Sequence, residues 1–176
     1  MSDPGLWRRI RWVKSVTGAE DVCAYSGDDE TSRAREPRGP GDRFDLHAAP
    51  EHAESLAEPA VGDLIVLTQH DQLTHLVEVT GAEVVRRPRS TIRRNSRDAR
   101  YSVQRECEVV ELRRFDVAPM IEEAFGFDPD AKGGDVQAIA ELEAYFRSGL
   151  PLWAVQRRIA QTLREDYRAR ITRKPR

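Results

Sequence analysis

Residues 61–81, VGDLIVLTQHDQLTHLVEVTG, decide the fold of this chain. An apolar run at 64–67 is too short for a helix and rich in β-branched residues, and a second strand pattern resumes at 76–79. The dipeptide Gly-Asp at 62–63 marks the start of the first strand, and polar residues at 70–73 supply the turn. Because 64–67 is apolar on both faces, we expect a strand that is buried on both sides, as inside a barrel or under a helix.

Further strands are predicted on either side of this hairpin. LWRRIRWVKSV at 6–16 combines tryptophans with β-branched residues at alternate positions, which favours a strand. YSVQRECEVVELRRF at 101–115 alternates in the same way, with an apolar middle and basic ends. Apolar islands at 22–25, 43–46 and 55–56 indicate short strands or a helical turn within a long polar segment.

The last third of the chain changes from alternation to helical spacing. Pro119 opens a short helix that Gly126 closes. Residues 135–147 predict a second helix, because their apolar residues recur at helical spacing. An amphipathic helix over 152–171 follows, with a basic face beside its apolar stripe.

Strands first and helices last predict an α+β fold. We expect a small mixed β-barrel of five to six strands with the C-terminal helices packed at one side or end. The barrel is predicted over 1–118 and includes a long acidic loop at about 19–59. A helical extension over 119–176 is predicted to pack on the barrel.

Charge is strongly segregated along the chain, although the formal net charge is only −2. Twelve acids against four arginines give −8 over 16–63, whereas eight arginines against one aspartate give +7 over 86–105. Eight basic residues against two acids give +6 over 152–176. Basic stretches of this kind favour a polyanionic partner. The alternative is that the acidic and basic segments neutralise each other within the fold.

Composition excludes several classes of protein. Cys23 and Cys107 are too few for a disulfide framework or a four-cysteine zinc site, and they favour a reducing, cytoplasmic location. No stretch approaches the roughly 18 apolar residues of a membrane span, and the N-terminus has no signal-peptide core, so we expect no membrane partner. His70, Asp71 and His75 surround a hairpin turn without a further ligand, so no metal site is expected.

The hairpin VGDLIVL and HLVEVTG, the later strand RECEVVEL and the early aromatic strand RIRWVKSV together resemble the PUA-like superfamily. The match is to its EVE branch, which is close to the YTH and ASCH domains. It covers about residues 6–115 and is specific only over 61–81 and 103–115. The resemblance implies a barrel that binds nucleic acid and holds a flipped, often modified base between aromatic side chains. Flipping costs a few kcal/mol, which stacking and hydrogen bonds to the base edge offset.

Under this resemblance, four aromatic residues are candidate walls of the base pocket: Trp7, Trp12, Tyr25 and Phe44. Trp12 is favoured because it lies on the strand that leads into the long loop. The alternative for each ring is a place in the core. Four arginines are candidate phosphate ligands: Arg93, Arg94, Arg97 and Arg105.

The sequence therefore predicts a non-catalytic reader of DNA or RNA, plain or modified, that needs no cofactor and flips a base into a pocket near Trp12. No serine-histidine motif, phosphate-binding loop or zinc-protease motif is present. Two alternatives stay open. One is a protein-interaction module whose basic helix at 152–171 docks on a partner protein, and the other is a small hydrolase of the ASCH type.

Overall fold

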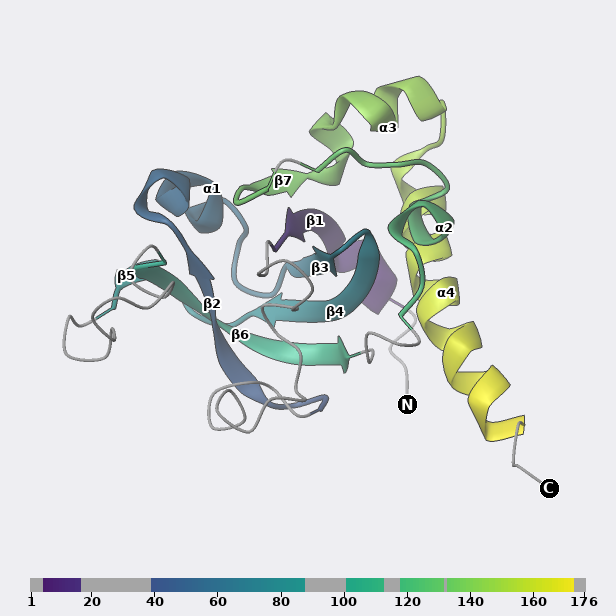
Figure 1. The fold of residues 1–176 in the computed structure, drawn as a ribbon, viewed down its shortest axis with the longest axis horizontal. Helices are drawn as coiled ribbons and strands as arrows, with labels where there is room; N and C mark the ends of the chain where they lie inside the picture. Colours follow the sequence, from purple (N-terminus) through teal and green to yellow (C-terminus); the bar gives the residue numbers. More distant parts are fainter. Residues whose placement is uncertain (1–4, 17–38, 88–100, 113–117, 132, 173–176) are drawn as a thin grey trace.

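One mixed sheet carries the fold, and Figure 1 shows that it is strongly curled. The computed structural model describes residues 5–16, 39–87, 101–112, 118–131 and 133–172, without the side chains of Phe44, Leu112 and 164–172. The strands are β1 (Ile10–Ser15), β2 (Arg43–Ala48), β3 (Leu64–Gln69), β4 (Gln72–Val79), β5 (Val85–Arg86), β6 (Val103–Leu112) and β7 (Val136–Ala138). Six of them lie in the order β2-β6-β4-β3-β1-β7, and β5 pairs with β6. β1 runs parallel to β3, whereas the other strand pairs described are antiparallel.

Helices pack mainly at one side of this sheet (Figure 1). They are η1 (Leu6–Arg9), η2 (Pro50–His52), α1 (Ala53–Ala57), α2 (Ile121–Phe125), η6 (Ile139–Glu141), α3 (Glu143–Ser148) and α4 (Leu152–Thr172). The long helix α4 contacts both η1 and α2. The predicted α+β fold is confirmed, and in place of the predicted barrel the structure has a curled mixed sheet that is barrel-like in form. No helix in the described ranges is long and apolar enough to cross a membrane.

The core has two parts, one on each face of the sheet. Leu64 and Val66 of β3 pack in the part that includes Val155 and Ile159 of α4. The alternate residues of β3, Ile65 and Leu67, face the inside of the curl and pack with residues of β2, α1 and β6. All six residues of β3 are buried, which confirms the expectation of a strand covered on both sides.

The Gly-Asp corner before β3 is held by one side chain from η1 and one from β1. Gly62 has a φ of +90°, a backbone conformation that favours glycine. The Asp63 carboxylate accepts hydrogen bonds from the Ala60 amide (3.0 Å) and from Nε1 of Trp12 (2.9 Å). Nε of Arg9 donates to the Gly62 carbonyl at 2.7 Å. The corner therefore fixes where β1 lies against β3.

The hairpin turn is tighter than the sequence indicates. It uses His70 and Asp71, both with positive φ, and β4 already begins at Gln72. Two positive φ values in a two-residue loop match the right-handed twist of the flanking strands.

Two predicted elements differ from those observed. The stretch expected to be one strand over 6–16 begins as the 3-10 helix η1, and β1 starts only at Ile10. The helix predicted over 135–147 is wrong, because residues 136–138 form β7 and α3 begins only at Glu143. β7 pairs antiparallel with β1, so pairing with a distant strand overrides the local helical spacing.

Candidate functional site

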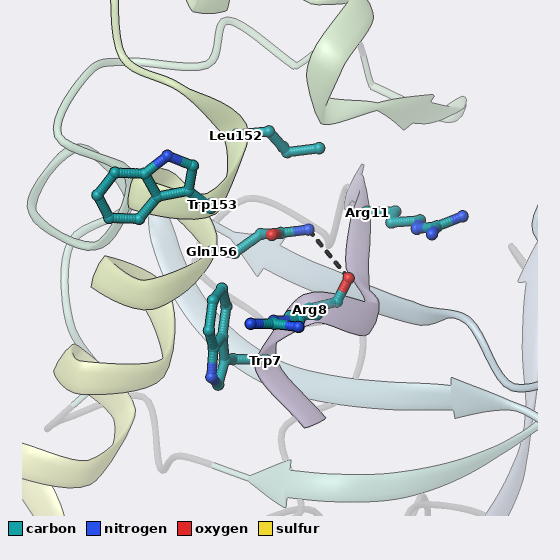
Figure 2. Close-up of a pocket in the computed structure, with 6 residues that line it drawn as sticks. All are labelled: Trp7, Arg8, Arg11, Leu152, Trp153 and Gln156. Atoms are coloured by element: carbon teal, nitrogen blue, oxygen red, sulfur yellow. Dashed lines mark hydrogen bonds between the residues drawn. The ribbon is translucent and has the colours of Figure 1, made fainter. Parts of the chain in front are cut away.

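An open pocket of about 640 Å³ lies between η1 and the first turns of α4. Six residues line it: Trp7, Arg8, Arg11, Leu152, Trp153 and Gln156. Figure 2 shows the Arg8 side chain against the Trp7 ring, with Trp153 and Arg11 on opposite sides of Gln156. The pocket therefore combines two flat aromatic surfaces with two guanidinium groups.

The two tryptophans reach the pocket from opposite ends of the chain. Trp7 belongs to η1 and is half-buried, because one side of it packs against the core. Trp153 is the second residue of α4, which begins directly after Pro151, a residue suited to the start of a helix. Trp153 is 56% exposed, so its indole ring is open to solvent beside the half-buried ring of Trp7.

The charge at this pocket is positive. The guanidinium carbon of Arg8 lies 5.2 Å from the centre of the Trp7 ring, within the range of a cation–π interaction. Arg8 and Arg11 are exposed, and within the described ranges no ion pair joins either of them to an acid. The amino end of α4, at Leu152, adds the positive end of a helix dipole.

Gln156 forms the floor of the pocket and is only 5% exposed. Its Nε2 donates to the Arg8 carbonyl (3.1 Å) and to the Ile10 carbonyl (2.8 Å). Because these carbonyls belong to η1 and β1, Gln156 ties α4 to the start of the sheet. This contact helps to hold η1, which carries Trp7, beside α4, which carries Trp153.

Of the two predicted pocket residues whose side chains the structure describes, Trp7 lines this pocket and Trp12 does not. Trp12 is half-buried on the opposite face of β1, where it packs against the inner core and donates to Asp63. Phe44 lies in β2 opposite Cys107, and its side chain is outside the described part. The remaining predicted residues outside the described ranges are Tyr25, Arg93, Arg94 and Arg97.

Arg105, the fourth predicted phosphate ligand, lies in the interior of the fold. It is only 3% exposed, and burial lowers the pKa of its guanidinium. Nη1 donates to the Leu56 carbonyl (2.8 Å) and Nε to the Gly81 carbonyl (3.1 Å). These bonds join β6 to α1 and to the end of the hairpin, which is a structural role.

A second polar cluster, missed in the sequence, lies where β1, α1 and β7 meet. Nδ1 of His52 lies 2.7 Å from Oδ1 of Asp135, and the Ser55 hydroxyl donates to the same oxygen at 3.0 Å. Lys14 is 2% exposed and donates to the Gly134 carbonyl, and burial lowers its pKa to about 8. Burial would raise the pKa of Asp135, but its bonds from His52 and Ser55 lower it overall.

This second cluster does not have the geometry of a hydrolase. A serine nucleophile needs a hydrogen bond to the ring of its histidine base. Ser55 and the His52 ring instead bond to one carboxylate oxygen, and Ser55 otherwise bonds to the main chain. The arrangement holds α1 against the start of β7.

Metal ligands are not gathered in the part of the chain that the structure describes. No group of three or more histidine, cysteine or acidic side chains there could hold an ion. His75 is buried in β4, and burial lowers its pKa to about 4.

Trp153 is the functional candidate that sequence reasoning missed. The sequence places it in the predicted final amphipathic helix, whose apolar stripe runs through Leu152, Val155 and Ile159. Trp153 lies off this stripe, on the side of the basic residues. A tryptophan outside the buried stripe of a helix is the signal that could have found it.

Comparison with known proteins gives little further information about this pocket. The sequence matches no family of known proteins and no curated protein. A solved structure described as a hypothetical protein from Leishmania major aligns with a TM-score of 0.43 at 12% sequence identity. The alignment covers 92% of this chain and 97% of that chain.

Proposed function

We propose that this protein binds single-stranded DNA or RNA through the pocket between η1 and α4. An unstacked base, plain or modified, lies against the indole rings of Trp7 and Trp153. Arg8 and Arg11 bind the phosphates beside that base. The proposal is carried by one observation: two indole rings meet two exposed guanidinium groups that have no acid partner within the described ranges.

The physical chemistry of single-strand binding fits these groups. Stacking on an aromatic side chain contributes about 1–3 kcal/mol per base and tolerates any base, since each base has a π-face. Arginine matches the geometry of phosphate oxygens and can bond to two of them. A pocket of about 640 Å³ is large enough for a ligand of this size, and its open shape lets a strand continue past it.

The resemblance of the hairpin and its neighbouring strands to the EVE branch of the PUA-like superfamily supports the same proposal. That family holds a flipped base between aromatic side chains. We place the base at Trp7 and Trp153 rather than at Trp12, because the Trp12 indole is already bonded to Asp63. The base is thus proposed to bind on the face of β1 that is opposite Trp12.

The direct test is a titration of a labelled single-stranded 10-mer, followed by fluorescence anisotropy. Trp153→Ala is expected to weaken binding about 5- to 150-fold, which corresponds to the loss of one stacked base. Arg11→Gln is expected to reduce the slope of log K against log salt by about 0.7, the value for one phosphate contact to a single strand. Arg43→Gln is the matched control, because Arg43 lies in β2 at the other end of the strand order.

Three outcomes would count against the proposal. Absence of binding by the wild-type protein would refute it, and so would equal weakening by Arg43→Gln and Arg11→Gln. Binding that does not change with salt would favour the alternative of a protein-interaction module, in which Trp153 is an apolar anchor for a partner protein.

A further inference from the structure

Gln156 occupies the centre of the pocket with a fixed orientation. Figure 2 shows its side-chain amide extending past the two indole rings, with the nitrogen directed at the Arg8 carbonyl. A second bond from the same nitrogen reaches the Ile10 carbonyl at 2.8 Å. Carbonyl oxygens only accept hydrogen bonds, so the amide must turn its nitrogen toward them, and both amide hydrogens are used.

The oxygen of this amide is therefore left for a ligand. Among the described residues no hydrogen bond reaches Oε1 of Gln156, and this atom is not sealed from solvent. The side chain is 5% exposed, so its conformation is restricted before any ligand arrives. An amide oxygen held in this way accepts a hydrogen bond at little cost in conformational entropy.

The other polar side chains that line the pocket are all donors. Arg8 and Arg11 carry only N–H groups, and the indoles of Trp7 and Trp153 can only donate. Among the described residues that line the pocket, Gln156 is thus the one that carries a side-chain acceptor. A base that stacks here can therefore donate a hydrogen bond to a side chain at Oε1 of Gln156.

We infer that the pocket selects bases that carry an exocyclic amino group, with Gln156 Oε1 accepting a hydrogen bond from that group. This inference rests on the proposed function and adds the chemical class of base. Adenine, cytosine and guanine each carry an amino group on their pairing edge. Thymine and uracil present one ring N–H between two carbonyl oxygens. If this N–H donated to Oε1 of Gln156, the two carbonyl oxygens of the base would lie close to Oε1 and repel it.

The test compares two single-stranded 10-mers on the wild-type protein by fluorescence anisotropy. One contains a central run of adenine, and the other contains unsubstituted purine at the same positions. The two strands have the same phosphates and the same two-ring stacking surface, and they differ in the amino group. Adenine is expected to bind about five- to tenfold more tightly, the contribution of one neutral hydrogen bond.

The outcomes of this test distinguish a failure of the inference from a failure of the proposed function. Equal affinity for both strands overturns the inference and leaves the proposed function standing. Absence of binding to either strand refutes the proposed function and the inference together. Tighter binding of the adenine strand supports both.

A variant identifies the residue that accepts the bond. Gln156→Met keeps a side chain of similar length and removes the acceptor, so the preference for adenine over purine is expected to fall to about onefold. Thermal unfolding shows whether this variant is folded, because it also loses the bonds to the Arg8 and Ile10 carbonyls. A folded Gln156→Met protein that still prefers adenine would overturn the assignment to Gln156. The wild-type comparison decides the inference where the variant does not fold.

Discussion

Asp63 is expected to stabilise the fold by joining the Gly-Asp corner to the first strand. Its carboxylate accepts from the Trp12 indole at 2.9 Å and from the Ala60 amide at 3.0 Å. A hydrogen bond to a charged group contributes about 1.5–3 kcal/mol, and partial exposure of Asp63 favours the lower end. Asp63→Ala removes both bonds, so the free energy of unfolding should fall by about 2–4 kcal/mol.

A double-mutant cycle isolates the bond between Asp63 and Trp12. Trp12→Phe keeps an aromatic ring in the inner core and removes the indole N–H, with an expected loss of about 1–2 kcal/mol. Urea unfolding of the two single variants and the double variant should give a coupling energy of about 1 kcal/mol. Asp63→Asn is the control that keeps an acceptor, and it should lose less than Asp63→Ala. Additivity of the two single changes within about 0.3 kcal/mol would refute this account of the corner.

Three further predictions concern His75, Cys107 and Gly134. Burial lowers the pKa of His75 from 6.5 to about 4, so only the unfolded chain takes up a proton between these values. Urea titrations should show the free energy of unfolding falling by up to about 3 kcal/mol as the pH decreases from 7 to 4. A His75→Phe variant whose free energy of unfolding depends on pH in the same way would contradict this. Burial raises the pKa of the Cys107 thiol to about 12, so in a Cys23→Ser background a thiol reagent at pH 8 should label the native protein far more slowly than the unfolded protein. Rapid labelling of the native protein would contradict the burial. Gly134 has a φ of +98°, and a Cβ there would collide with the His52 ring. Gly134→Ala should therefore lower the free energy of unfolding by about 2–3 kcal/mol, measured by thermal or urea unfolding. A loss below about 0.5 kcal/mol would argue against this packing.

The central hairpin could be predicted because its signals are local. Four consecutive apolar residues, a Gly-Asp dipeptide and a polar turn lie within 61–81, and they correspond to β3 and β4. The final helix could be predicted for the same reason, since its apolar stripe repeats over several turns.

β7 could not be predicted because its cause is not local. Val136 and Ile139 have helical spacing, yet residues 136–138 pair with Trp12, Val13 and Lys14 of β1. An edge of the sheet more than a hundred residues away decides the conformation of this short segment. The sequence between the two strands carries no mark of that pairing.

The pocket depends on a similar distant contact. Gln156 and Arg8 are 148 positions apart, and their hydrogen bond joins α4 to η1, where Trp153 and Trp7 line one pocket. Sequence reasoning could identify Trp7 as an aromatic candidate, but it could not identify the partner ring. It favoured Trp12, whose neighbour Asp63 becomes visible only when β1 is placed beside β3.

The most direct test of the central claim is a ¹⁵N–¹H NMR spectrum of the three tryptophan indole groups during titration with a single-stranded adenine 10-mer. The chain has only three tryptophans, so each indole N–H gives one assignable signal. We predict that the signals of Trp7 and Trp153 shift with the oligonucleotide, whereas that of Trp12, bonded to Asp63, stays in place. A spectrum in which no signal moves, or in which Trp12 moves while the other two do not, would contradict the claim that the base binds between η1 and α4.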